Sequence, residues 1–390
     1  MKSILTIILS CFCLIAVNAD DERIWLNAKI NGQPVRFAFD TGTGANFVLF
    51  STMAKKLGLK VTPPDPNQKP APGQIILGTT ELCNLDFGIT NVRTSVNVLE
   101  MPGYLKSSQD GWIGWPALSN NIIYMDVAAS RVDLLTNIPA DSTNWMQFHI
   151  ETISGDLVLI IGGDKNTKMV VAVDTGSDYG VHLNSKKWRE WKALQTNQPT
   201  TMEAYYVANL GLVVAEESWA NEISLDSFTL TDIPVMQADS GEIALFSSPQ
   251  TQFEATLGLV ALKRLDFVID GKHGIAYLWP KKTPPLPYEH NRLGAVFVPR
   301  ALQSDDLIAY VIEGSPAYAA GIRNDDILLK IGELDTTKWR TDPNVLPLSR
   351  FWNSPAGTKL ELTLKRDDKT FKAMAILRNI LPPDSMKNSN

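Results

Sequence analysis

Two identical triplets of an acid, a hydroxyl residue and a glycine have the composition of a catalytic site. The triplet Asp-Thr-Gly occupies residues 40–42 and again residues 174–176, each time directly after an apolar stretch. Carboxylates that a fold brings together share a proton, and such a pair can act as general acid and general base. One triplet arises by chance about once in several thousand positions. A single triplet would indicate only an aspartate in a turn or at a helix N-terminus. The catalytic interpretation therefore depends on the presence of two matching triplets.

The residues around the two triplets repeat as well. Residues 23–40 align without a gap on residues 157–174, and both segments indicate a strand, a polar turn and a second strand. Further along, Trp-Ile-Gly at 112–114 aligns with Thr-Leu-Gly at 256–258, and this register then holds as far as Leu134 and Leu278. The offset between copies is 134 residues at the triplets and 144 at these later glycines. The chain therefore repeats a whole lobe, with about ten extra residues in the second copy.

This pattern resembles the aspartic peptidases of the pepsin and retropepsin superfamily, from residue 23 to about residue 278. Three features in each lobe carry the resemblance: the strand that ends in the triplet, the later apolar-apolar-Gly strand, and the short helix and hairpin after it. Two lobes in one chain are typical of pepsin, whereas lobes of about 120 residues are closer to retropepsin size. The resemblance implies a mainly β, two-lobe fold and an aspartic endopeptidase that uses no cofactor and no metal.

The resemblance also implies the roles of the triplet residues. The two carboxylates would meet at a pseudo-twofold axis and share one proton, so that one activates a water and the other protonates the scissile carbonyl. The glycines would permit the tight turn, the threonines would hydrogen-bond across the axis, and the next hydroxyl residues match those of pepsin-type enzymes. The candidate residues are Asp40 and Asp174 for catalysis, supported by Thr41, Gly42, Thr43, Thr175, Gly176 and Ser177.

In pepsin-like enzymes a hairpin flap closes the cleft, and we expect it here between about residues 68 and 81. The pepsin flap carries a Tyr that this stretch lacks. In the second lobe, Tyr205, Tyr206 and Trp219 could line the cleft, although single aromatic residues more often belong to the core. They are therefore not counted as site residues.

Composition and the remaining motifs argue against other functions. The formal net charge is −6 and no basic stripe is present, which argues against a nucleic-acid partner. Residues 42–44 lack the third glycine and the helix of a dinucleotide-binding loop. Nothing signals a Ser/His/Asp triad. None of the four histidines has metal-ligand spacing; they are His149, His182, His273 and His290.

The N-terminus predicts export. Residues 1–19 have the positive start, apolar stretch and small-residue cleavage site of a signal peptide. The residues up to Cys11 loosely resemble a lipoprotein signal, so lipid attachment at Cys11 is the alternative to cleavage after residue 19. We expect attachment to a membrane only in that case. After cleavage Cys83 alone remains, which excludes an intrachain disulfide, and we expect it in the core. These features indicate the periplasm or cell envelope of a bacterium, with secretion as an alternative.

A proline-rich segment divides the chain. Residues 280–287 contain four prolines and predict a semi-rigid linker. The expected organisation is a signal peptide (1–19), lobe one (20–140), lobe two (141–279), the linker (280–287), a third domain (288–381) and a tail (382–390).

The third domain resembles a PDZ domain of the bacterial envelope-protease type, from Leu293 to about Leu377. PDZ domains bind a peptide C-terminus by adding it as a strand to a sheet edge. By resemblance, a short loop binds the terminal carboxylate with its backbone amides, and a glycine lets the ligand approach closely. That loop is Leu293, Gly294, Ala295 and Val296. The alternative is a PDZ domain that only packs on the peptidase lobes and binds nothing.

The sequence therefore predicts an exported aspartic endopeptidase that acts on peptides or proteins, with a PDZ domain that recruits substrate or regulates access to the cleft. The alternative is a catalytically silent, peptidase-like protein that binds peptides through its PDZ domain. The intact triplets argue against that alternative, and the missing flap Tyr favours it. A third possibility is a protein that cleaves only itself or one dedicated partner.

Overall fold

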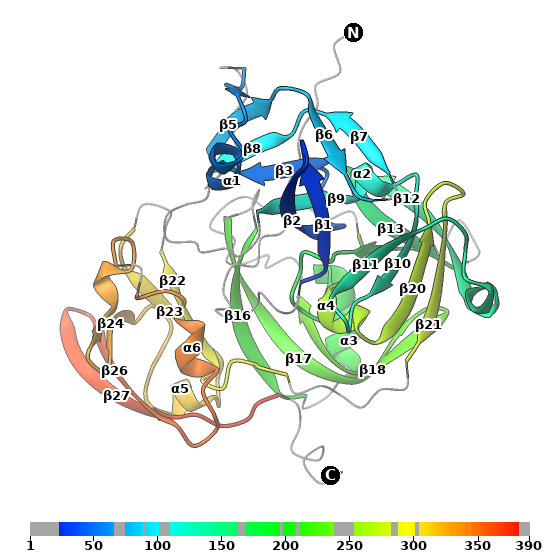
Figure 1. Ribbon diagram of the computed structural model, residues 1–390. Helices are drawn as coiled ribbons and strands as arrows, with labels where there is room; N and C mark the ends of the chain where they lie inside the picture. The colour runs from blue at the N-terminus through cyan, green and yellow to red at the C-terminus, as the bar shows by residue number, and fades with distance from the viewer. Residues whose placement is uncertain are drawn as a thin grey trace.

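A computed structural model describes residues 23–65, 75–88, 90–100, 110–162, 168–195, 198–207, 211–237, 253–281, 288–300, 304–342 and 344–381. The expected signal peptide and tail lie outside these residues, as do half of the expected flap (68–74) and most of the expected linker (282–287). Within the described residues, strands β1 to β21 form one large sheet system and strands β22 to β27 form a second sheet (Figure 1). Across these ranges, no helix has both the length and the apolar character needed to span a membrane.

Lobe one consists of short strands and two short helices, each of one to two turns. Along β1 every second residue is buried, which is the pattern of a strand with one face on a core. The last four residues of β2 are all buried, so the strand that leads into the first triplet runs through the interior. The elements are β1 (Trp25–Ile30), β2 (Gln33–Asp40), β3 (Phe47–Phe50), α1 (Ser51–Lys56), β4 (Val61–Thr62), β5 (Ile75–Thr80), β6 (Cys83–Asp86), β7 (Asn91–Thr94), β8 (Asn97–Glu100), β9 (Gly111–Gly114), α2 (Trp115–Leu118), β10 (Ile122–Asp126) and β11 (Arg131–Leu135).

Lobe two repeats this plan with longer central strands. Its elements are η2 (Ala140–Asn144), β12 (Met146–Ile153), β13 (Asp156–Ile161), β14 (Met169–Val173), β15 (Val181–Leu183), α3 (Ser185–Leu194), β16 (Thr200–Val207), β17 (Gly211–Leu225), β18 (Phe228–Gln237), β19 (Ala255–Leu257), α4 (Leu259–Leu262), β20 (Leu265–Asp270) and β21 (Ile275–Pro280). The extra length of the second copy falls in this middle part, which contains the β16–β17 hairpin (Figure 1).

Strand pairing confirms the internal repeat and corrects one detail of it. Phe39 pairs with Ile113 between the parallel strands β2 and β9, and Val173 pairs with Leu257 in the same way between β14 and β19. These partners are related by the expected offsets of 134 and 144. The preceding strand does not follow the expected gapless alignment.

The correction concerns the two antiparallel hairpins that lead into the triplets. Trp25 pairs with Ala38 in the first hairpin, whereas Val158, not Leu159, pairs with the corresponding Ala172 in the second. The first strand of the repeat is therefore displaced by one residue. The physical reason is that, between equivalent paired positions, the second hairpin contains one more residue than the first.

The two lobes share one hydrophobic core. β10 of lobe one pairs with β20 of lobe two, with Ile123 opposite Ile269. A single cluster of buried side chains contains Phe37 and Ile123 from lobe one together with Phe267 and Ile269 from lobe two. Cys83 is fully buried in this cluster, as a core residue should be. A shared sheet and a shared core fix the two triplets relative to each other.

The C-terminal domain, residues 288–381, has its own sheet and core. Phe297, Leu328 and Trp352 belong to a separate buried cluster. Buried Asp326 accepts two hydrogen bonds from Arg366, at 2.6 and 2.7 Å. The elements are β22 (Ala295–Pro299), β23 (Leu307–Val311), α5 (Pro316–Ala319), β24 (Ile327–Ile331), β25 (Leu334–Asp335), η3 (Thr336–Lys338), α6 (Ser349–Trp352), β26 (Lys359–Arg366) and β27 (Lys369–Ile376).

Candidate active site

The two aspartates lie at equivalent strand ends in the interior. Asp40 is the last residue of β2, and Asp174 directly follows β14. Each strand pairs with a parallel neighbour up to the triplet, which holds its end rigidly. Asp40 and Asp174 are only 5% and 3% exposed, so both carboxyl groups are largely shielded from water.

The glycines of the triplets show how close the two carboxyl groups are. A Cβ atom placed on Gly42 would lie 2.4 Å from Cγ of Asp174. A Cβ atom placed on Gly176 would lie 2.5 Å from Oδ1 of Asp40. Each glycine therefore faces the carboxyl group of the opposite lobe, and any larger residue at either position would collide with it. The structure thus brings together Asp40 and Asp174, which are far apart in the sequence.

The threonines of the triplets bond to each other across the two lobes. The amide of Thr41 donates to Oγ1 of Thr175 at 3.0 Å, and the amide of Thr175 donates to Oγ1 of Thr41 at 3.1 Å. Within each triplet the glycine amide donates to the aspartate: Gly42 to Asp40 Oδ1 at 3.1 Å and Gly176 to Asp174 Oδ1 at 2.9 Å. The arrangement has the twofold symmetry that the repeat predicts.

Burial dominates the electrostatics of the pair. Loss of hydration raises the pKa of Asp174 to about 6, although the Gly176 amide, the Arg23 charge and a side-chain hydrogen bond from Asp40 oppose this rise. Burial also raises the pKa of Asp40 well above its usual range, and the nearby charge of Asp174 raises it further. Two such groups titrate as a unit and hold one proton between them over a range of pH.

Arg23 is a site residue that the sequence interpretation missed. Its guanidinium donates to the carbonyl of Gly176 at 3.1 Å and lies 3.5 Å from Asp178. Its positive charge lowers the pKa of both Asp40 and Asp174. The alignment of the two lobes, once shifted by one residue in the first strand, could have revealed Arg23 because it pairs this residue with another charged residue.

With the register corrected, Arg23 corresponds to Asp156, and both are buried charged residues beside the dyad. The charge of Asp156 raises the pKa of Asp40, which is opposite to the effect of Arg23. The two lobes therefore place opposite charges at matching positions, so the surroundings of the dyad are not symmetric.

The hydroxyl residues after the triplets, Thr43 and Ser177, are buried, but their hydroxyl groups do not bond to the dyad among the described contacts. Thr43 Oγ1 accepts a hydrogen bond from the Ala45 amide at 3.4 Å. The hydroxyl of Ser177 is buried without a hydrogen-bond partner among the described residues. Neither has a described hydrogen bond to a carboxyl group of the dyad, so their supporting role stays a prediction.

The predicted carboxylate-binding loop of the C-terminal domain is already engaged by an internal side chain. The amides of Leu293 and Gly294 donate to Oδ1 of Asn291 at 2.9 and 3.0 Å. Ala295 and Val296 are buried. A ligand carboxylate at this loop would therefore have to replace the Asn291 oxygen. Asn291 was not singled out from the sequence, because nothing in its local pattern marks a buried amide.

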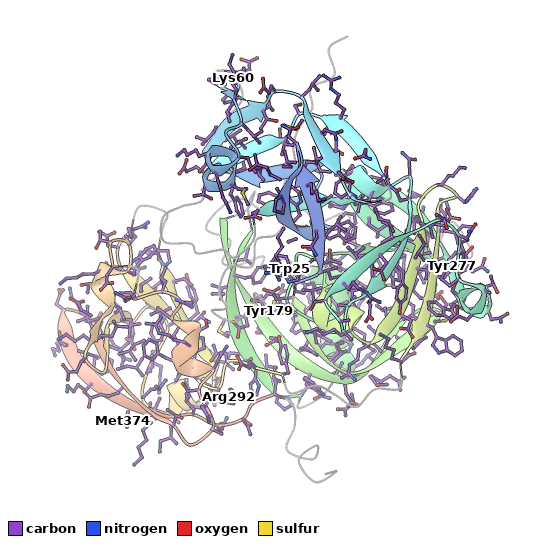
Figure 2. All side chains as sticks on the ribbon, viewed as in Figure 1. Trp25, Lys60, Tyr179, Tyr277, Arg292 and Met374 are labelled. Carbon is purple, nitrogen blue, oxygen red and sulfur yellow. The ribbon has the colours of Figure 1, made fainter. Side chains whose placement is uncertain are left out.

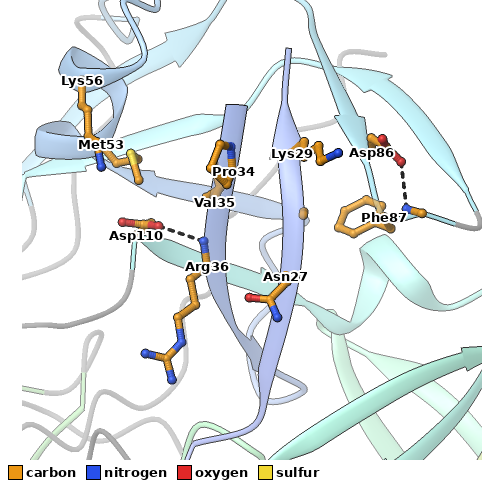
Figure 3. A pocket seen from close by; sticks show the side chains of 12 residues that line it. Asn27, Lys29, Pro34, Val35, Arg36, Met53, Lys56, Asp86, Phe87 and Asp110 are labelled. Carbon is orange, nitrogen blue, oxygen red and sulfur yellow. Dashed lines mark hydrogen bonds between the residues drawn. The ribbon is translucent and has the colours of Figure 1, made fainter. Parts of the chain in front are cut away.

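A shallow groove on the outer face of lobe one does not belong to this site. It has a volume of about 500 Å³ and is lined by residues that include Lys29, Arg36, Lys56 and Phe87 (Figure 3). No residue of either triplet lines it. The groove is therefore separate from the dyad.

Comparison with known proteins agrees with the geometry of the first lobe. A family model described as aspartyl protease matches residues 26–117. The match supports an aspartic protease-like fold for this mainly β part of the chain, and it points to aspartic protease-type chemistry. No curated protein matches the chain.

Two solved structures are similar to the chain. One is the retroviral protease-like domain of Ddi1 from Leishmania major, at 17% identity and a TM-score of 0.22, covering 30% of this chain and 90% of that one. The other is Basic 7S globulin from soybean, at 10% identity and a TM-score of 0.37, covering 66% of this chain and 91% of that one.

Proposed function

We propose that the protein is an aspartic endopeptidase in which Asp40 and Asp174 activate a water molecule against a peptide bond. One observation carries the proposal: each triplet's glycine faces the carboxyl group of the other triplet at a separation that leaves no room for a Cβ atom. Two buried carboxyl groups this close share one proton, so one is a base while the other is an acid.

The proposed reaction uses that shared proton. The ionised carboxylate takes a proton from water, whose oxygen attacks the scissile carbonyl carbon, while the protonated carboxyl group donates its proton to the carbonyl oxygen. This forms a gem-diol. Its collapse breaks the C–N bond, the amine nitrogen takes the proton that the first carboxyl group received from water, and one diol hydroxyl returns its proton to the other carboxylate. The products are an acid, an amine and a dyad restored with its single proton.

For the C-terminal domain we propose PDZ-type binding of a peptide end. β22 lies at the edge of its sheet. Gly294 accepts a hydrogen bond from the Ile312 amide, so the alternate residues Val296 and Val298 bond to β23 in the antiparallel ladder. The backbone groups of Phe297 then point away from β23, toward the side on which a peptide strand could be added. The N-terminal segment, residues 1–19, supports export to a bacterial periplasm or envelope.

The experiment compares four forms of the purified chain: the parent, Asp40→Asn, Asp174→Asn and Asp86→Asn. Asp86 is a partly exposed acid of lobe one outside the dyad and controls for loss of a carboxylate. Each form is incubated with a mixed peptide library from acidic to neutral pH, and products are identified by mass spectrometry. We expect cleavage by the parent and Asp86→Asn, and at least a thousandfold slower cleavage by either dyad variant.

Cleavage that survives both dyad substitutions would contradict the proposed mechanism. If no form cleaves the library and pepstatin-type ligands do not bind, the observations favour the catalytically silent, peptide-binding alternative. Cleavage confined to the chain itself or to one co-purifying protein identifies a dedicated peptidase.

A further inference from the structure

The β16–β17 hairpin of lobe two is the structural counterpart of the β4–β5 hairpin of lobe one. β3 pairs with β9 and β8, and β15 pairs in the same senses with β19 and β18. The hairpin that follows the helix in each lobe then pairs its second strand antiparallel to β8 or β18. The expected flap of lobe one, at about residues 68–81, includes β5. The β16–β17 hairpin is therefore the corresponding candidate flap of lobe two, and its described strands are longer than β4 and β5.

One face of the β16–β17 hairpin packs on the catalytic loop of lobe two. Tyr205, Val213 and Ala215 form a buried cluster with Met236, against which Tyr179 packs. The rings of Tyr179 and Tyr205 are 5.6 Å apart. Tyr179, labelled in Figure 2, lies five residues after Asp174, in the loop that the second triplet begins. This face of the hairpin is therefore in direct contact with the loop that carries the catalytic carboxylate.

The opposite face of the hairpin packs on the C-terminal domain. Met202, Ala204 and Val214 form a buried cluster with Val296 and Val298 of β22. Because side chains alternate along a strand, these residues and the Tyr205 cluster point to opposite faces. Figure 1 shows β16 lying between the C-terminal sheet and the rest of lobe two. The hairpin is thus enclosed between the catalytic loop and the C-terminal domain.

Buried hydrogen bonds through Asn291 fix this contact. Its Nδ2 donates to the carbonyls of Met202 and Ala295, each at 2.8 Å, and Thr201 Oγ1 donates to the Asn291 carbonyl at 2.6 Å. Asn291 and Thr201 are fully buried. Breaking such a contact would leave buried polar groups without partners, which costs about 1–3 kcal/mol for each group.

We propose that the C-terminal domain positions the β16–β17 hairpin as the second wall of the substrate cleft, with Asn291, Val296 and Val298 as positioning residues. The proposal rests on the proposed function, because a cleft wall matters only if a peptide binds above the dyad. Loosening the contact should weaken substrate binding, since the counterpart of the lobe-one flap would lie against the bound peptide. It should leave the chemical step nearly unchanged, since the dyad is held by bonds between the triplets.

The first test measures the hairpin without any assay of activity. Val298→Asp places a charge in the apolar contact, and Ile376→Asp places the same charge on β27 of the same domain, where the side chain is 55% exposed. Hydrogen exchange is followed by mass spectrometry in the full chain. We expect amides of β16 and β17 to exchange at least tenfold faster in Val298→Asp, and lobe-one amides and the Ile376→Asp control to match the parent. Unchanged exchange of the hairpin would overturn the proposal.

A milder variant covers the case in which Val298→Asp does not fold. Thr201→Val keeps the side-chain shape and removes only the hydroxyl that bonds to Asn291. We expect faster exchange of the hairpin, by a factor of about 3–10. Hairpin exchange as slow as in the parent, in a folded Thr201→Val chain, also counts against the proposal.

The second test separates this proposal from the proposed function. With a peptide that the parent cleaves, Thr201→Val and Val298→Asp should raise KM at least fivefold and keep kcat within about twofold. A fall in kcat at constant KM would overturn the role in substrate binding. If the parent cleaves nothing while the exchange difference is present, the proposed function fails but the positioning of the hairpin stands.

Discussion

Thr41 and Thr175 each donate a hydroxyl hydrogen to the strand that carries the other triplet. Thr41 Oγ1 donates to the carbonyl of Val173 and Thr175 Oγ1 to the carbonyl of Phe39, both at 2.6 Å. Together with the reciprocal amide bonds, four hydrogen bonds hold the two strand ends as one unit. The relative position of the two carboxyl groups therefore depends on a pair of threonines rather than on the lobes separately.

The first prediction follows from this relationship. Thr41→Val keeps the side-chain shape but leaves the Val173 carbonyl and the Thr175 amide without their partner. We expect a loss of about 1–3 kcal/mol in the free energy of unfolding, and at least a tenfold fall in kcat/KM because the carboxyl groups lose their alignment. Denaturant unfolding and peptide cleavage measure the two effects. Thr41→Ser retains the hydroxyl and should behave like the parent; equal losses in both variants would assign the effect to packing.

The second prediction concerns Arg23 and the pH profile. The charge of Arg23 favours ionisation of both aspartates, so removing it raises both pKa values. In Arg23→Met we expect both limbs of the kcat/KM profile to move to higher pH by roughly one unit. The control is Arg36→Met, an exposed arginine of the same lobe, whose profile should match that of the parent. A shift to lower pH in Arg23→Met would contradict the assignment.

The third prediction concerns stability and the dyad. The pKa of Asp174 is raised from 3.8 to about 6 in the fold, so its contribution to stability is fully present below pH 3.8 and is lost as the pH rises through 6. Asp174→Asn cannot ionise and should be more stable than the parent at pH 8, by about 2–3 kcal/mol. Denaturant unfolding at pH 5 and pH 8 measures this difference. The control Asp86→Asn should show no such gain in stability. If Asp174→Asn is less stable than the parent at pH 8, burial of the ionised Asp174 carboxylate does not destabilise the fold as predicted.

The fourth prediction concerns two buried carboxyl groups of the β16–β17 hairpin next to the C-terminal domain. Glu217 is fully buried and accepts a hydrogen bond from the Tyr288 hydroxyl. Burial raises the pKa of Glu203 to about 8, although the amides of Asn291 and Ala204 oppose this rise. Burial and the charge of Glu203 raise the pKa of Glu217 well above its usual range. Both carboxyl groups therefore favour the protonated form more strongly than an exposed glutamate does.

The stability that Glu203 contributes is fully present below pH 4.5 and is lost as the pH rises through about 8. We expect the parent to lose on the order of 3 kcal/mol between pH 6 and pH 9, and Glu203→Gln to lose much less. Glu222→Gln, an exposed acid on β17, is the matched control and should follow the parent. Denaturant unfolding at several pH values measures the free energy of unfolding of each form. The prediction is wrong if this free energy falls equally with pH in the parent and in Glu203→Gln.

The paired triplets and the repeat could be predicted from the sequence because both depend on local pattern. An apolar strand that ends in Asp-Thr-Gly has the same form in both lobes, and its strand partners follow at fixed offsets. The one-residue error before the second triplet arose because a turn can absorb a residue without changing the hydrophobic pattern. Arg23 and Asn291 were missed in part because Arg23 bonds to Gly176 and Asn291 to Met202, partners that only the fold brings close.

The sequence by itself determined the two Asp-Thr-Gly triplets and the repeated strands that carry them, because apolar periodicity and turn residues are local properties. Only the tertiary structure decided that the triplet glycines face the opposite carboxyl groups, that Arg23 and Asp156 place opposite charges beside the dyad, and that Asn291 occupies the predicted loop and bonds to β16. These relationships follow from how separate elements pack. Packing depends on the three-dimensional fit of many side chains at once, which no single stretch of sequence contains.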